Sequence, residues 1–188
     1  MLSSYTTTLP SDVMLDTGIL YIGNSIFAAQ DGGIKFDPGK TFRQIAFDGQ
    51  RSRIRGLDRT VMFAPKITGN VLELSPTTIP SLEPGAQSVS LPGSPTGFTT
   101  GYEPKSAGTL FLENDYISTP RCIWQRGDGT YVQVRFYDGA LVTKWDLAGT
   151  DKQEVKIAIE LEAVLDMTVS GRKVSDPPFV IEFFATSP

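Results

Sequence analysis

Apolar and polar residues alternate in several stretches of this chain. The clearest is EVKIAIELEAVLD, residues 154–166, in which Val155, Ile157, Ile159 and Leu161 occupy every second position and charged residues occupy most of the others. A period of two is typical of a strand with one buried face and one solvated face. We therefore predict a half-buried strand, although glutamate, alanine and leucine would also suit a helix.

The same pattern predicts strands along most of the chain. They are expected at residues 18–22, 34–36, 41–47, 61–64, 67–74, 121–125, 131–137, 140–146 and 179–184. The dipeptide Asp-Gly, which favours hairpin turns, recurs at residues 31–32, 48–49, 128–129 and 138–139. We therefore predict an all-β fold of repeated hairpins, in which residues 121–146 form a three-stranded β-meander.

The stretch GGIKFDPGKT, residues 32–41, ends like the phosphate-binding loop of a nucleotide hydrolase. Such a loop has four residues between its first glycine and the Gly-Lys-Thr end, and it opens a helix. Here five residues separate Gly33 from Gly39, and the residues that follow alternate as in a strand. Without a helix N-terminus there is no row of free N–H groups to hold phosphate. We interpret the stretch as a strand followed by a turn.

Residues 75–108 differ in character from the rest of the chain. They hold six of the 13 prolines and five of the 18 glycines. Proline stops helices from growing, so at most a short helix is expected, near residues 78–82. The segment is predicted to be a long loop with a role of its own, or alternatively a linker between two small domains.

Several classes of chemistry are excluded by composition. Histidine is absent and Cys122 is the only cysteine, so histidine-dependent catalysis, histidine metal sites, cysteine zinc clusters and an intrachain disulfide are impossible. We interpret Glu160 and Glu162 as one solvated face rather than a catalytic pair, and Cys122 as a small buried filler. The chain is predicted not to be an enzyme, with no catalytic, cofactor-binding or metal-binding residues.

Length and hydropathy favour one domain covering residues 1–188. No apolar run approaches the length of a bilayer crossing, so no membrane partner is expected. The first residues lack the basic start and apolar core of a signal peptide, which favours synthesis in a cytoplasm.

Charge is unevenly distributed. Residues 34–66 carry eight basic and three acidic residues, a net charge of +5, whereas the rest of the chain carries nine basic and eighteen acidic residues, a net charge of −9. Such asymmetry is typical either of nucleic-acid binding or of a basic arm that meets the acidic surface of the next molecule. The overall charge of −4 disfavours a dedicated DNA-binding protein, because that binding depends on neutralising phosphates.

The order of these segments resembles a known family. The stretches GILYIG, DGGIKFDPG, TFRQIAFDGQRSRIRGLDR and APKITGNVLELS are similar to the first half of the major tail tube protein of long-tailed, non-contractile bacteriophages. The later stretches IWQRGDGTYVQVRFYDGALVTKWDL, DKQEVKIAIELEAVLD and DPPFVIEFF continue the likeness. It covers nearly the whole chain and is weakest over residues 75–108.

The resemblance implies a β-sandwich or barrel with one short helix, found in the virion tail. Six subunits would form a ring, and rings would stack into a hollow tube in which strands from several subunits build a shared inner barrel. DNA would pass through without specific binding. Other tail proteins, such as the tape measure, terminator and distal tail proteins, would be partners.

Within that expectation, we predict that a basic hairpin at residues 34–66 is the assembly arm. Its second run is expected to be SRIRG, residues 52–56. The predicted arm residues are Lys35, Phe36, Arg43, Arg51, Arg53, Arg55 and Arg59. Glu160 and Glu162 are the predicted lumen-facing residues, because a conduit for DNA should repel phosphate.

Two other interpretations stay open at this point. One is a different tail component with the same fold, such as a tail completion protein or a protein near the baseplate. The other is a carbohydrate-binding β-sandwich, whose site would use Trp124, Trp145 or Tyr102, although tryptophans within strands more often pack in cores or interfaces.

Overall fold

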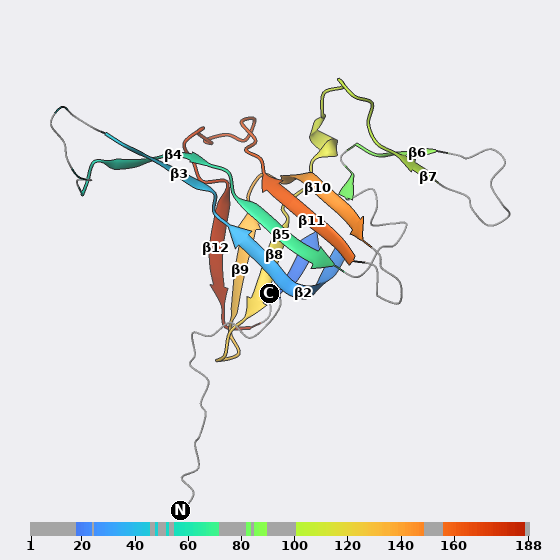
Figure 1. Ribbon diagram of the computed structural model, residues 1–188, viewed down its shortest axis with the longest axis horizontal. Coiled ribbons are helices and arrows are strands. Elements are labelled where there is room, and N and C mark those ends of the chain that lie inside the picture. The colour runs from blue at the N-terminus through green and yellow to red at the C-terminus, as the bar shows by residue number, and fades with distance from the viewer. Residues whose placement is uncertain are drawn as a thin grey trace, which may run out of the picture.

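The computed structural model describes residues 18–23, 25–45, 48, 52, 55–71, 82–83, 85–89, 101–148 and 156–186. These ranges contain strands and one short 3-10 helix (Figure 1). The elements are β1 (Ile19–Ile22), β2 (Ser25–Asp37), β3 (Lys40–Gln44), β4 (Asp58–Phe63), β5 (Lys66–Val71), β6 (Gln87–Val89), β7 (Gly101–Glu103), η1 (Glu113–Asp115), β8 (Arg121–Gln125), β9 (Tyr131–Phe136), β10 (Ala140–Ala148), β11 (Lys156–Ala163) and β12 (Phe179–Phe184). The prediction of an all-β fold is confirmed.

Eight of the strands form one antiparallel sheet. Their order is β10-β11-β5-β2-β1-β8-β9-β12. The sheet folds over on itself, so that β12, β9, β8 and β1 lie behind β2, β5 and β11 in Figure 1. We call the layer β10-β11-β5-β2 the front half and the layer β1-β8-β9-β12 the back half.

Strand β2 belongs to both halves. Its first residues pair with β1, from Ser25 opposite Ile22 to Ala28 opposite Ile19. From Ala29 onward it pairs with β5, and the register is irregular between Gln30 and Ile34. The predicted hairpin turn at residues 31–32 is therefore wrong: Asp-Gly and the following glycine form an irregularity inside one long strand, because extra residues in a strand bend it.

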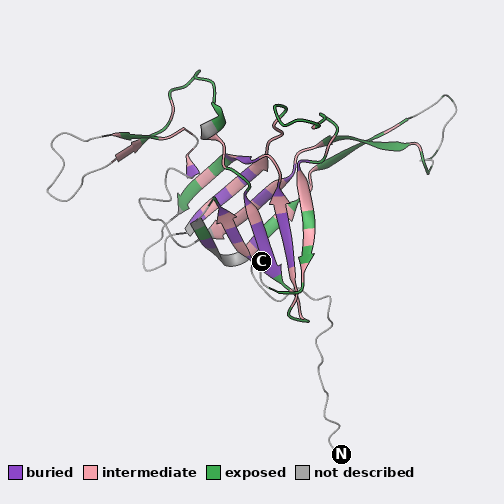
Figure 2. Cartoon of the chain, turned by 180° about the vertical axis from the view of Figure 1, so that it is seen from behind, coloured by how far each residue is buried: buried purple, intermediate pink, exposed green. Residues whose placement is uncertain are grey.

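The core lies between the two halves. The back half contributes side chains such as Leu20 and Phe136, the start of β2 contributes Phe27, and the front half contributes Ile157 and Leu161, all of them almost completely buried. In Figure 2 the buried residues are concentrated on the strands of the main sheet. Each such side chain contributes about 1.5–3 kcal/mol when it leaves water. On β11 the residues between the buried ones point outward, which confirms the predicted half-buried strand.

The predicted β-meander is confirmed only in its first hairpin. Strands β8 and β9 pair through a turn that includes the predicted Asp-Gly at residues 128–129. Strand β9 then pairs with β12, and β10 pairs with β11 in the other half. The second Asp-Gly, Asp138-Gly139, is thus a corner at which the chain crosses between halves.

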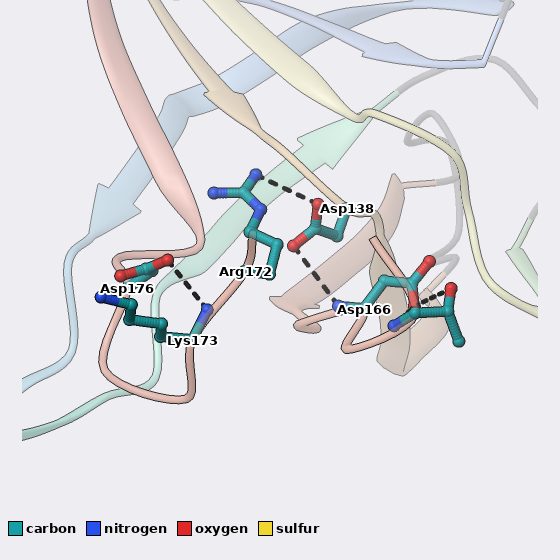
Figure 3. Close-up of polar contacts among 6 residues, drawn as sticks. Asp138, Asp166, Arg172, Lys173 and Asp176 are labelled. Atoms are coloured by element: carbon teal, nitrogen blue, oxygen red, sulfur yellow. Dashed lines mark hydrogen bonds and ion pairs between the residues drawn. The ribbon is translucent and has the colours of Figure 1, made fainter. Parts of the chain in front are cut away.

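The corner is held by loop 164–178, as Figure 3 shows. Arg172 Nη2 donates to Asp138 Oδ1 at 3.1 Å, and the backbone N–H of Asp166 donates to Asp138 Oδ2 at 3.3 Å. Gly139 has a φ of +126°, and a Cβ there would lie 2.7 Å from the carbonyl oxygen of Ile117. Both oxygens of the Asp138 carboxylate bind the loop, and Gly139 lies close to the backbone of Ile117. These contacts hold the residues as a corner between the two halves of the sheet and not as a tight hairpin turn.

Two further hairpins lie outside the main sheet. Strands β3 and β4 pair with each other, as do β6 and β7, and the two hairpins project from opposite sides of the body (Figure 1). The segment 75–108 is thus not a structureless loop, since β6 and β7 pair within it. Of the helix predicted at residues 78–82, only Leu82 is described; it is helical and fully buried in the core.

The turn before β3 decides the interpretation of Gly39-Lys40-Thr41. Asp37 Oδ1 accepts a hydrogen bond of 2.9 Å from the N–H of Gly39, and a strand, not a helix, follows from Lys40. Gly39 has a φ of +53°, and a Cβ there would overlap the carbonyl group of Ala64. The strand-and-turn interpretation is confirmed, and the glycine is required by close packing of two backbones.

Replacing Gly39 by alanine is therefore expected to destabilise the protein strongly. The left-handed conformation alone costs a side chain about 1–2 kcal/mol, and the clash adds about 1–3 kcal/mol. Gly23→Ala is the matched control, because Gly23 has a φ of +58° and nothing lies within 4 Å of the position that its Cβ would take. Denaturant unfolding followed by tryptophan fluorescence measures both; equal losses for the two variants would contradict the account.

Candidate assembly surfaces

The hairpin β3–β4, which we call the arm, is exposed along most of its length (Figure 2). Phe42, Ile45, Val61 and Met62 are each more than half exposed, although they are large apolar side chains. An isolated two-stranded hairpin is marginally stable in water, and exposed apolar groups of this kind are typical of interaction surfaces. The arm thus has the properties of a segment that another molecule covers.

The arm is anchored to the body by aromatic packing at its base. The ring of Phe63 lies 6.3 Å from that of Phe179 on β12, and the ring of Phe36 lies 5.0 Å from Phe179. Both contacts are edge-to-face, a favourable geometry for aromatic pairs. Phe36 thus supports the arm from inside the body and is not part of its exposed surface.

The predicted arm residues are separated by the structure. Lys35 and Phe36 lie in β2 of the main sheet, Arg55 is exposed in a turn, and Arg51 and Arg53 lie outside the described residues. The predicted pairing of TFRQIAF with SRIRG is wrong, because β3 pairs with β4, residues 58–63. The run SRIRG precedes that strand; its described residues Ser52, Arg55 and Gly56 form a bend and a turn.

Arg43 and Arg59 do lie on the arm, directly opposite each other on paired strands. Like charges in this position destabilise a hairpin. Both side chains are exposed, and within the described part of the chain neither forms an ion pair. A carboxylate from another molecule would relieve their repulsion, since guanidinium and carboxylate groups bind strongly.

The outward face of the front half, which we call the polar face, is rich in charged residues. The described side chains with charge on it are Lys35, Asp37, Lys66, Lys144, Asp146, Glu160 and Glu162. Three lysines against four carboxylates leave a net charge of −1 on this face. Glu160 and Glu162 both project here, so the predicted lumen residues share one exposed face with cations.

Lys66 on β5 bridges the two glutamates. Its Nζ lies 2.8 Å from Glu160 Oε1 and 3.3 Å from Glu162 Oε2. The hydrogen bond from Lys66, followed by that from Thr143, lowers the pKa of Glu160. The hydrogen bonds to Glu160 and Glu162 raise the pKa of Lys66. All three side chains are about a third exposed, so solvent screens these interactions.

Both edges of the front half lack a partner strand in the described part of the chain. Strand β10 is the last strand of the sheet, and its outer side pairs among the described residues only through a bridge between Ala140 and Ile117. Gln30 and residues 34–37 of β2 pair only with β5. Edge strands expose unpaired N–H and C=O groups, which favour pairing with another chain. The polar face is thus a four-stranded sheet that can be extended on both sides.

The loop between β7 and β8 carries an exposed apolar run that the sequence interpretation missed. Leu110 is 84% exposed and Leu112 is 66% exposed. The run LFL within a polar, glycine-containing loop was the available signal. Lys105 forms an ion pair with Asp115, which also accepts a 2.6 Å hydrogen bond from the N–H of Leu112, so the loop is tied to η1.

Cys122 and Trp124 lie in the core, which confirms the prediction that Cys122 is a buried filler, and Trp145 is partly buried against that core. Cys122 is fully buried, its thiol donates to the carbonyl oxygen of Val134 at 3.8 Å, and burial raises its pKa. Trp124 is buried in the core, and Trp145 donates a 2.6 Å hydrogen bond to Glu83 Oε2. Burial makes the Cys122 thiol a poor nucleophile and removes Trp124 from any sugar-binding surface.

Within the described ranges, no group of three or more histidine, cysteine, aspartate or glutamate residues is arranged to hold a metal ion. No helix in the described ranges is long and apolar enough to span a membrane. No protein-family model matches the chain, and no curated protein does so either.

The bridge by Lys66 predicts a pH-dependent coupling in a double-mutant cycle of Lys66→Met with Glu160→Gln. Glu160, with a lowered pKa, contributes stability above its ordinary pKa of 4.5, and this is lost as pH falls through its folded value. Lys66, with a raised pKa, contributes below its ordinary 10.5, and this is lost as pH rises through its folded value.

The coupling free energy between Lys66 and Glu160 should therefore be greatest at pH values between the ordinary pKa values of the two groups. It should disappear in acid, where Glu160 is protonated. The matched control is Lys144→Met with Glu160→Gln, because Lys144 acts on Glu160 through charge alone. Urea unfolding across pH measures both cycles. A coupling for Lys66 that persists unchanged in acid, or that does not exceed the Lys144 value, would contradict the bridge.

Proposed function

We propose that this chain is a structural subunit of the tail tube of a long-tailed, non-contractile bacteriophage, where copies assemble into stacked rings around the path of the DNA. The observation that carries the proposal is the polar face with its two free edges. Strands β10, β11, β5 and β2 are successively antiparallel, so the first and the fourth run in opposite directions. The sequence resemblance supports the same conclusion.

This alternation of strand directions allows copies of the chain to join edge to edge. When a second copy stands beside the first in the same orientation, its β2 edge is antiparallel to the β10 edge of the first. The sheet then continues from copy to copy, and a head-to-tail contact of this kind closes into a ring if its rotation allows. Closure also removes every free edge of the front halves.

In such a ring the polar face lines the lumen. A lumen with mixed charges and a net charge near −1 per described face offers DNA few uncompensated cations, and phosphate binding depends on those. The pairing of Lys66 with Glu160 and Glu162 neutralises the cation at the centre of the face. DNA would therefore pass without being held, and tape measure protein could occupy the tube before it.

The arm supplies a second contact with a neighbouring copy. Its exposed apolar residues need an apolar surface to cover them, and its opposed Arg43 and Arg59 need carboxylates. Exposed ion pairs contribute only about 0–1 kcal/mol each, but a ring repeats the contact at every subunit. A tail completion or baseplate-proximal protein would use the same surfaces in a shorter assembly, and filament length in purified protein separates these two functions.

The proposal is tested by electron microscopy of the purified protein together with its mass in solution. Hollow rings or tubes are expected for the wild-type chain, and a monomer at high concentration would contradict the proposal.

The single variant Arg59→Glu tests the role of the arm's charge, because it should stabilise the arm and yet weaken assembly. It places a glutamate opposite Arg43, so the arm itself should gain about 0.2–1 kcal/mol from an opposite-charge pair. Assembly should nevertheless weaken, because the patch that meets carboxylates loses its charge, and wild-type assembly should likewise weaken as salt rises.

The matched control is Arg59→Lys, which keeps the charge and should assemble. Sedimentation velocity and thermal unfolding measure both effects. If Arg59→Glu assembles as well as the wild type at low salt, the arm does not act through its charge.

A further inference from the structure

The apolar run Leu110–Leu112, which we call the knob, is held in place and points into solvent. The ion pair of Lys105 with Asp115 ties together the segments on either side of it. The ring of Phe111 packs edge-to-face on Tyr116 at 6.3 Å, which leaves the flanking leucines exposed. Apolar side chains on an anchored loop lose little conformational freedom on binding, so they are suited to insert into a complementary groove.

A groove with matching chemistry lies at the base of the arm. Strand β4 forms one wall, and the other wall comes from the end of β11 and loop 164–178. Its apolar lining includes Val61, Met62, Phe63, Leu165, Val174 and Pro178. Val174 is 81% exposed, so the groove presents apolar surface that no described part of this chain covers.

The loop wall of the groove is preformed. Arg172 is fixed by Asp138 (Figure 3). Its guanidinium group also lies over the ring of Tyr137, 4.4 Å from the ring centroid. The N–H of Lys173 donates to Asp176 Oδ2 at 2.9 Å, which closes the turn that carries Val174. A wall held by these contacts needs no rearrangement to receive a ligand.

The knob and the groove lie on opposite sides of the body. The segment between β7 and β8 rises beside β10, whereas the arm leaves beside β12, and the view from behind agrees (Figures 1 and 2). A chain cannot fill its own groove across that separation, but its neighbour can. The head-to-tail placement that sets β2 of one copy beside β10 of another also brings groove and knob to the same junction.

Charge complementarity supports the same pairing. Exposed Glu103 and Glu113 flank the knob, and exposed Arg43 and Arg59 lie on the arm that borders the groove. We propose that the knob of one copy seats in the groove of the next copy, with these glutamates facing the arm arginines. The inference rests on the proposed tube function and adds to it the residues of the lateral contact.

Cysteine cross-linking tests the contact, using Leu112→Cys and Val174→Cys in the full-length chain. The natural Cys122 is fully buried and does not compete for a short bis-maleimide. The double variant carries both halves of the contact, so it should yield a ladder of covalent multimers. An equimolar mixture of the two single variants should yield covalent dimers only, and each single variant alone should stay uncross-linked.

The matched control combines Leu112→Cys with Ala185→Cys, an exposed position just after the far end of β12. It should not cross-link more than the single variants do. Assembly is measured on the same samples by electron microscopy before the reagent is added. Rings that form without the ladder would overturn the contact and leave the proposed function standing.

Two other cross-linking results would also contradict the contact between knob and groove. Dimers from Leu112→Cys alone would mean that two knobs meet, which contradicts the head-to-tail contact. Protein that stays monomeric and does not cross-link would overturn both the contact and the proposed function.

A second variant, Leu112→Ser, should lower the assembled fraction at a given concentration without shifting thermal unfolding, because Leu112 is exposed in the single chain.

Discussion

The fold depends on one strand serving two layers. β2 pairs with β1 at its start and with β5 over the rest of its length, so a single continuous segment joins the back half to the front half. The irregularity between Gln30 and Ile34 lets it bend between the layers. Without that bend, Phe27 and Ile34 would not face one common core, and the eight strands would form an open sheet with one side in water.

The corner at Asp138-Gly139 is another place at which the chain passes from one half of the sheet to the other. Gly139 allows the chain to leave β9 and start β10 in the opposite layer, and the buried Asp138 carboxylate fixes loop 164–178 against the corner. The same contacts therefore close the core and shape one wall of the groove. A buried carboxylate with a fixed partner is costly to leave unpaired, so the loop and the corner are expected to form together.

Outside the closed core, several surface groups have no partner within the described part of a single copy. Two sheet edges lack partners among the described strands, two arginines on the arm oppose each other, and large apolar side chains stand exposed on the arm and the knob. Assembly is the explanation that we propose for this combination, because it satisfies the edges, charges and apolar groups together.

Sequence patterns predict the strands better than their partners. The period of two identifies β11, and the patterns around residues 121–125 and 179–184 place β8 and β12, because β-branched and aromatic residues gather in these runs. Alternation says which side of a strand is buried, but it carries no information on which strand lies beside it. The Asp-Gly dipeptides at residues 31–32 and 138–139 therefore predict hairpin turns, whereas in the structure they mark a bend and a corner.

The candidate surfaces could be predicted only in part for the same reason. The excess of positive charge locates the arm, and the shared side of Glu160 and Glu162 places them on one exposed face. Composition cannot reveal that β4 rather than SRIRG pairs with β3, since that choice is set by register along the hairpin. The lysine that bridges the glutamates comes from β5, far earlier in the chain, and only the folded sheet brings it there.

We propose that the front halves of neighbouring copies form one continuous sheet, and amide hydrogen exchange tests this proposal most directly. The account predicts that backbone amides on the free edges of β10 and of residues 30–37 become protected when the protein assembles, while amides of β12 change little. Assembled particles are compared with the same protein diluted until it is unassembled. Edge amides of β10 and β2 that exchange equally fast in both states would contradict the claim.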